Sequence, residues 1–151
     1  MKSIRYTYFK SDKTLYKKFL GVLIKKGNLT KAKALLDKTF FLVSKKMGFS
    51  KEVILLKLFI SLNTFVEVKK VRIKRRSFLI PFSINIKRRS YLIIRWLMQA
   101  VKEDVSKTSL SVKLSNEILS LIRCGLTRSK KLKKLNISQA ISNRSNIHYR
   151  W

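Results

Sequence analysis

The chain has 151 residues, of which 36 are Lys or Arg and 7 are Asp or Glu, so its net charge is +29. Like charges at this density repel one another in a compact fold, which indicates a polyanionic partner, either a nucleic acid or an anionic membrane surface. A membrane-spanning helix is excluded, because Lys or Arg interrupts every apolar run before the roughly 18 residues that such a helix needs. The apolar fraction of 46% excludes a wholly disordered chain, and the length is that of one domain.

Residues suited to catalysis or metal binding are sparse. Cys124 is the only cysteine and His148 the only histidine, which excludes an internal disulfide and a zinc site built on paired ligands. The acidic residues are scattered singly, apart from Glu103 and Asp104, and the four glycines form no phosphate-binding loop. We therefore expect a non-enzyme with no catalytic residue, metal, cofactor or small-molecule substrate.

Three helices are predicted in the first part of the chain, because apolar residues recur there at spacings of three and four. The first runs from about Lys13 to Gly27-Asn28, the second from a Thr30 cap to Gly48, and the third from a Ser50 cap to Asn63. Their expected buried positions are Leu15, Phe19, Val22 and Leu23; Leu36, Phe40, Val43 and Met47; and Ile54, Leu55, Leu58 and Leu62.

A β-hairpin is predicted at residues 65–86, where the apolar period changes to two. One arm alternates from Phe78 to Ile86, and the other shifts phase at Lys69-Lys70, which predicts a bulge. The turn is expected at residues 74–77. Pro81 has no amide hydrogen, so it is expected at an outer edge or a bulge.

Helical spacing returns after the hairpin. Leu92, Trp96 and Ala100 mark one line of a central helix, and Ile93, Leu97 and Val101 mark the line beside it. A fifth helix covers Leu110 to Ile122 and ends at Cys124-Gly125. A basic loop at about residues 126–136 and a last helix follow. The expected fold is mainly α: a single domain, residues 1–151, of about six helices, with a two-stranded β-ribbon protruding between the third and fourth.

Cations cluster at two places in and after the hairpin. Arg72, Lys74, Arg75 and Arg76 surround the predicted tip, where they can meet phosphates. Residues 87–89, Lys-Arg-Arg, oppose the macrodipole at the start of the fourth helix unless a phosphate lies nearby.

The aromatic residues have two expected roles. Trp96 is expected in the core. Tyr149 and Trp151, at the end of the chain, fit either stacking on unpaired bases or packing within a terminal helix.

The chain resembles small-subunit ribosomal protein seven over nearly its whole length. The residues that carry the resemblance are NRSNIHYRW at 143–151, KRRSYLIIRW at 87–96, LSNE at 114–117, VEV at 66–68 with Pro81, and FLGVLIKKG at 19–27. At the ribbon tip, where the family usually has Gly-Gly, this chain has Lys74-Arg75.

The resemblance implies a helical protein with a β-ribbon that binds the 3′ major domain of small-subunit rRNA and organises the subunit head. Its implied partners are this rRNA, other head proteins, and exit-site tRNA and departing mRNA. By position it adds further rRNA contacts to the ribbon tip: Lys87, Arg88, Arg89, Arg95, Lys130, Lys131, Asn143, Arg144, His148, Tyr149 and Arg150, with Trp151 beside them.

The amino-acid composition suggests the cellular compartment. The 25 Lys against 11 Arg, with frequent Ile and Asn, are typical of an AT-rich genome. Ending at Tyr-Arg-Trp is similar to mitochondrial members of the family, so a mitochondrial small subunit is expected, with a plastid or a bacterial cytoplasm as alternatives. The competing function is that of a basic architectural DNA-binding protein. A membrane-surface protein ranks last, because the apolar helical faces suffice to cover one another.

Overall fold

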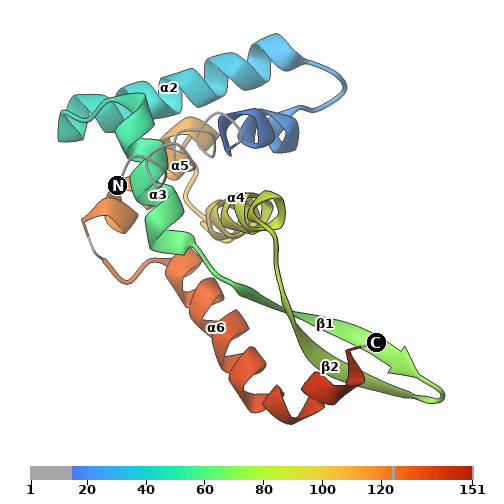
Figure 1. The fold of residues 1–151 in the computed structure, drawn as a ribbon. Coiled ribbons are helices and arrows are strands. Elements are labelled where there is room, and N and C mark those ends of the chain that lie inside the picture. Colours follow the sequence, from blue (N-terminus) through green and yellow to red (C-terminus); the bar gives the residue numbers. More distant parts are fainter. Residues whose placement is uncertain (1–14, 124, 151) are drawn as a thin grey trace, which may run out of the picture.

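The computed structural model describes residues 15–123 and 125–150. After a helical segment at residues 15–23, the elements are α2 (Leu29–Met47), α3 (Lys51–Leu62), β1 (Val66–Ile73), β2 (Arg76–Ser83), α4 (Ile86–Lys102), α5 (Leu110–Ile122), α6 (Arg128–Ser142) and the 3₁₀ helix η1 (Arg144–Tyr149). The fold is therefore mainly helical, with an antiparallel ribbon between the third and fourth helices, as predicted. Figure 1 shows the ribbon projecting from the helical body, with α2 at the opposite end of the molecule.

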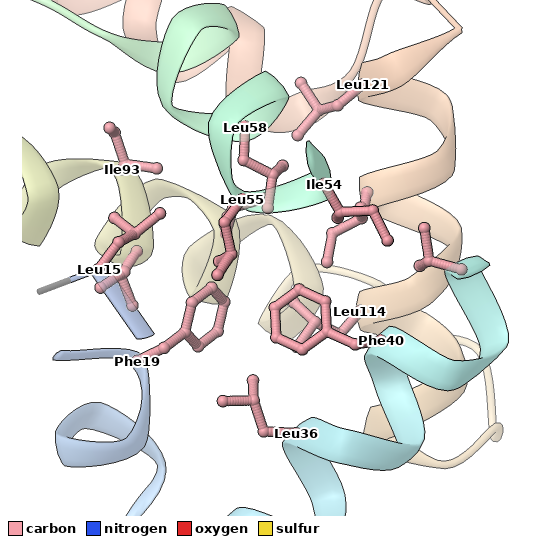
Figure 2. Packing of buried hydrophobic residues seen from close by; sticks show 14 of the residues in the cluster. Leu15, Phe19, Leu36, Phe40, Ile54, Leu55, Leu58, Ile93, Leu114 and Leu121 are labelled. Atoms are coloured by element: carbon pink, nitrogen blue, oxygen red, sulfur yellow. The ribbon is translucent and has the colours of Figure 1, made fainter. Parts of the chain in front are cut away.

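One apolar core joins the segment 15–23 to α2, α3, α4 and α5. Phe19 and Phe40 face each other across this core, with Leu55 of α3 and Leu114 of α5 beside them (Figure 2). The predicted faces of α3 and α4 are buried throughout. Val22 is an exception, since it is 40% exposed. The buried line of its helix is Leu15, Phe19 and Leu23 at spacings of four, which leaves Val22 at the edge.

Helix boundaries follow the predicted signals at Gly48 and Ser50, whereas the first helix, expected to reach Gly27-Asn28, ends at residue 23. Gly48 takes a left-handed conformation with φ 69° and donates its amide to Ser44, which ends α2 as expected. Ser50 is the N-cap residue of α3, again as predicted. The expected cap of α2 is wrong, because Asn28 precedes the helix and Thr30 lies in its first turn.

The ribbon differs from the prediction in three details. Pairing runs unbroken from Val66 opposite Ser83 to Ile73 opposite Arg76, so the predicted bulge at Lys69-Lys70 is absent. The phase shift has another cause: Val66 and Val68 lie on one face of the ribbon, whereas Val71 lies on the other face opposite Phe78, so the apolar residues of β1 change face without an inserted residue. The turn is the two residues Lys74 and Arg75 and not residues 74–77. Ile86, expected in the strand, is the first residue of α4 and is 52% exposed.

The predicted basic loop at residues 126–136 is also wrong, because most of it is the first half of α6. Thr127 accepts a hydrogen bond from the Lys130 amide at 3.3 Å, and the Ser129 amide donates to Glu117 Oε1 at 3.1 Å. These acceptors satisfy the free amides of the helix start. Leu132 anchors the same helix against a second apolar cluster formed by Ile84, Leu92 and Trp96. Trp96 is thus a core residue, as expected.

Candidate nucleic-acid interface

The surface carries a large uncompensated positive charge. Among the described residues, ion pairs form only between Lys51 and Asp37 and between Arg88 and Glu67. The carboxylate of Glu117 is used instead to hold α6, and that of Asp104 accepts from Ser106. Most cations therefore face solvent without an acidic partner, an arrangement that favours a polyanionic ligand.

The tip of the ribbon is the part of this surface farthest from the helical body (Figure 1). Arg72, Lys74, Arg75 and Arg76 are all exposed there. Alternation along the strands places Arg72 and Arg76 on opposite faces, so cations point to both sides of the ribbon. Lys74 has φ 53°, a left-handed conformation that costs a non-glycine residue roughly 1–2 kcal/mol.

The predicted junction cluster splits into three different environments. Arg88 forms a bidentate pair with Glu67, from Nε to Oε2 at 2.9 Å and from Nη2 to Oε1 at 2.6 Å. Arg89 donates to the Ile84 carbonyl at 3.1 Å and lies 4.1 Å from the ring centroid of Phe65. Lys87 remains exposed. Two of the three cations therefore also fix the base of the ribbon to α4.

Hydrogen bonding from Arg88 holds the pKa of Glu67 below its ordinary value. Nearby, Lys18 donates to the Lys87 carbonyl, and burial with the charge of Lys87 lowers the pKa of Lys18. The start of α4 thus carries Lys87, Arg88 and Arg89, of which only Arg88 is paired with a carboxylate of the described residues, and the helix N-terminus adds further positive potential. Both the side-chain cations and the helix N-terminus therefore favour the binding of an anion at this end of α4.

Cations on α4 and α6 extend the surface. Arg95 and Lys131 are exposed, and Lys130 is half-buried. Lys133, which the sequence reasoning missed, donates to the Ser61 carbonyl at 2.9 Å and so satisfies the end of α3. Burial lowers the pKa of Lys133, and the charge of Lys130 adds to the effect. Its signal in the sequence is the spacing of three from Lys130, which places both on one helical face.

The end of the chain is fastened to the ribbon. We call residues 144–150, which comprise η1 and Arg150, the C-terminal strap. Asn146 donates to the Leu79 carbonyl at 3.1 Å, and Arg150 Nε donates to the Pro81 carbonyl at 2.7 Å. Tyr149 stacks on Phe78 with ring centroids 4.9 Å apart and planes 26° apart. Pro81 therefore lies on the outer edge of β2, as predicted.

The structure gives the predicted RNA contacts near the end of the chain several different environments. Tyr149 packs within the protein, which is one of its two expected roles. Asn143 caps α6 by donating to Gln139, while Arg144 and His148 are exposed. Trp151 lies outside the described residues. The sequence did not predict the roles of Asn136 and Asn146, which donate to the Val66 and Leu79 carbonyls of the ribbon. A side chain that donates to a backbone carbonyl some 70 residues away leaves no local pattern.

Two kinds of feature are absent from the described residues. No group of three His, Cys, Asp or Glu side chains in that part of the chain is placed to hold a metal ion. None of its helices is both long and apolar enough to cross a membrane.

Residues 2–144 match the family of ribosomal protein S7p/S5e. The chain belongs to this family. It is 33% identical over 144 residues to the small ribosomal subunit protein uS7m of Marchantia polymorpha, covering 93% of this chain and 61% of that protein. It is also 28% identical over 142 residues to uS7 of Shewanella amazonensis, covering 94% of this chain and 90% of that protein.

The family match confirms the resemblance noted in the sequence. The chain spans 61% of the length of the Marchantia relative. Members of the S7p/S5e family are structural ribosomal components and not enzymes, in agreement with the sequence-based expectation.

Proposed function

We propose that this chain is a structural protein of the small ribosomal subunit that binds rRNA. The observation that carries the proposal is the S7p/S5e family match over residues 2–144. Two relatives that match more than nine tenths of the chain are named small ribosomal subunit proteins. The net charge of +29 on 151 residues agrees with a polyanionic partner.

Within the subunit, we propose that the chain binds the 3′ major domain of the rRNA and organises assembly of the head. Other head proteins, exit-site tRNA and departing mRNA are its further proposed neighbours. This placement follows from the family resemblance.

The exposed cations provide the proposed contacts. RNA phosphates would be contacted by the ribbon tip, by the start of α4 and by the exposed side of α6. At the ribbon tip the contacting residues are Arg72, Lys74, Arg75 and Arg76. The deep groove of A-form RNA is closed to side chains, so recognition is expected at junctions and loops. The proposed rRNA contacts elsewhere are Lys87, Arg88, Arg89, Arg95, Lys130, Lys131, Asn143, Arg144, His148, Tyr149, Arg150 and Trp151.

We propose a mitochondrial ribosome as the location. The uS7m relative and the AT-rich coding bias support this choice, while the similar bacterial uS7 supports the bacterial alternative. A gradient of lysed, purified mitochondria from the source cells distinguishes the two, because a bacterial-type protein would be absent from it.

Sedimentation tests the proposed function itself. A native lysate is run through a gradient at moderate salt, after nuclease removal of mRNA, and the chain is followed by mass spectrometry. The expected result is co-migration with small-subunit rRNA. Migration with DNA would overturn the proposal in favour of the architectural DNA-binding alternative, and migration with membranes would overturn it as well.

A further inference from the structure

A groove of about 550 Å³ lies between the base of the ribbon and the inner side of α6 and the C-terminal strap. Phe65 and Pro81 line it from the ribbon side, and Ile141 and Ile147 line it from α6 and η1. In Figure 1 these elements form three sides of a triangle. The volume is in the range of small-molecule sites, roughly 300–1,000 Å³, and far too small for an RNA duplex.

The walls of this groove are apolar but not covered by the protein. Phe65 and Ile141 are each 62% exposed, Ile147 is 45% exposed and Ile137 is 38% exposed. Exposed apolar residues that line one depression mark a binding surface more often than scattered ones do.

The rim of the groove is cationic. Lys133, Arg144 and Arg150 line it, and no acidic residue does. Arg150 donates a hydrogen bond to the Pro81 carbonyl, and Lys133 donates one to the Ser61 carbonyl at the end of α3. Arg144 is exposed, and its guanidinium makes no hydrogen bond or ion pair with the described residues. The occupant that complements these walls therefore combines a flat apolar part with a negative charge.

We propose that the groove binds an unpaired nucleotide of the rRNA, with its base against Phe65 and Ile141 and its phosphate on Arg144. The inference rests on the proposed function and adds a site for a single extruded base to the phosphate contacts of the ribbon. Unpaired bases are bound by aromatic faces and by Arg guanidinium planes. Arg89 stacks on one face of the Phe65 ring, with 4.1 Å from the guanidinium carbon to the ring centroid, and Phe65 is still 62% exposed for contact with a base.

The test compares two exposed positions that differ in their distance from the groove. Ile141→Glu places a carboxylate on the groove wall, where it repels a phosphate and disfavours a base. Phe41→Glu adds the same charge at a residue that is 64% exposed on α2, at the far end of the body. The probe is a transcript of the 3′ major domain of small-subunit rRNA, titrated at one fixed salt concentration.

We expect Ile141→Glu to weaken binding by about tenfold or more, since one stacked base contributes that much, and Phe41→Glu to weaken it far less. Ultraviolet crosslinking of the wild-type complex should join Phe65 to an unpaired nucleotide. That crosslink should disappear in Ile141→Glu, while crosslinks from the ribbon tip persist. Arg144→Gln, at an exposed position, provides a second variant with the same expected direction.

Three results separate the possible failures. Equal affinity of both Glu variants, with no crosslink at Phe65, would overturn the groove site and leave the proposed function standing. Absence of binding by the wild-type chain would overturn the proposed function. Retention of full RNA affinity by Ile141→Glu, with loss of a protein partner instead, would assign the groove to a protein segment and also overturn the nucleotide site.

Discussion

Glu67 is the acidic side chain that ties the ribbon to α4. It is 8% exposed and accepts both hydrogen bonds from Arg88. Glu67→Gln removes the charge and one of the two acceptor oxygens. We expect a loss of about 1 kcal/mol in the free energy of unfolding, below the roughly 1.5–3 kcal/mol typical of hydrogen bonds to charged groups, because water can reach the Arg88 side chain. Urea denaturation at pH 7 measures it. Glu103→Gln, an exposed and charge-matched control, should change little; equal losses would contradict the prediction.

The same pair predicts a pH dependence. Hydrogen bonding from Arg88 lowers the pKa of Glu67 in the folded state, so the pair stabilises the protein fully above the ordinary value of 4.5 that the group has in the unfolded chain. This stabilisation is lost as the pH falls through the lowered folded value. We therefore expect the difference in unfolding free energy between wild type and Glu67→Gln to shrink between about pH 5 and pH 3. Urea denaturation at several pH values measures it, and a constant difference would argue against this account.

Lys74 is a strained residue at the tip of the ribbon, with φ 53°. Lys74→Gly and Lys74→Ala both remove its charge, but only glycine relieves the strain. We expect the Gly variant to be more stable than the Ala variant by about 1 kcal/mol. Both should lose rRNA affinity to the same extent, because the phosphate contact is lost in each. Filter binding measures the affinity, and full affinity in either variant would show that the charge at this position is not used.

At the scale of elements, the C-terminal strap holds β2 through bonds between residues some 70 positions apart. The double variant Tyr149→Ala, Arg150→Ala removes the stack on Phe78 and the bond to Pro81. We expect hydrogen exchange in β2 to become roughly tenfold faster, while exchange in α2 and α3 stays unchanged. Lys134→Ala, at an exposed position on α6, is the control. Unchanged exchange in β2 would show that the ribbon keeps its position without the strap.

The elements differ in how far the sequence could predict them. The faces of α3 and α4 were predictable because burial follows the helical period directly. The start of α6 was not predictable from the sequence, because one of its free amides, that of Ser129, donates to Glu117 on α5. The shift at Lys69-Lys70 looked like a bulge because a local pattern cannot show that the apolar residues of β1 change from one face of the ribbon to the other while the pairing continues.

At the scale of the whole molecule, charge and family motifs indicated a polyanion-binding surface but not the partners of each cation. Arg88 and Lys133 show the difficulty, since one pairs with Glu67 and the other with the end of α3. A local pattern shows that a residue is basic, whereas its availability to RNA depends on which distant groups fold against it. The proposed RNA contacts therefore need a test that counts phosphates.

The salt dependence of rRNA binding reports how many phosphates the protein neutralises. Each neutralised phosphate releases counterions, so the logarithm of the affinity falls linearly with the logarithm of salt concentration. We expect Arg75→Gln, Arg76→Gln to reduce the magnitude of this slope by about 2. The control, Lys38→Gln, Lys45→Gln, removes two exposed cations from α2 and should leave the slope nearly unchanged. Equal slopes in the two double variants would mean that the ribbon tip neutralises no phosphate, and its cations would then need another explanation.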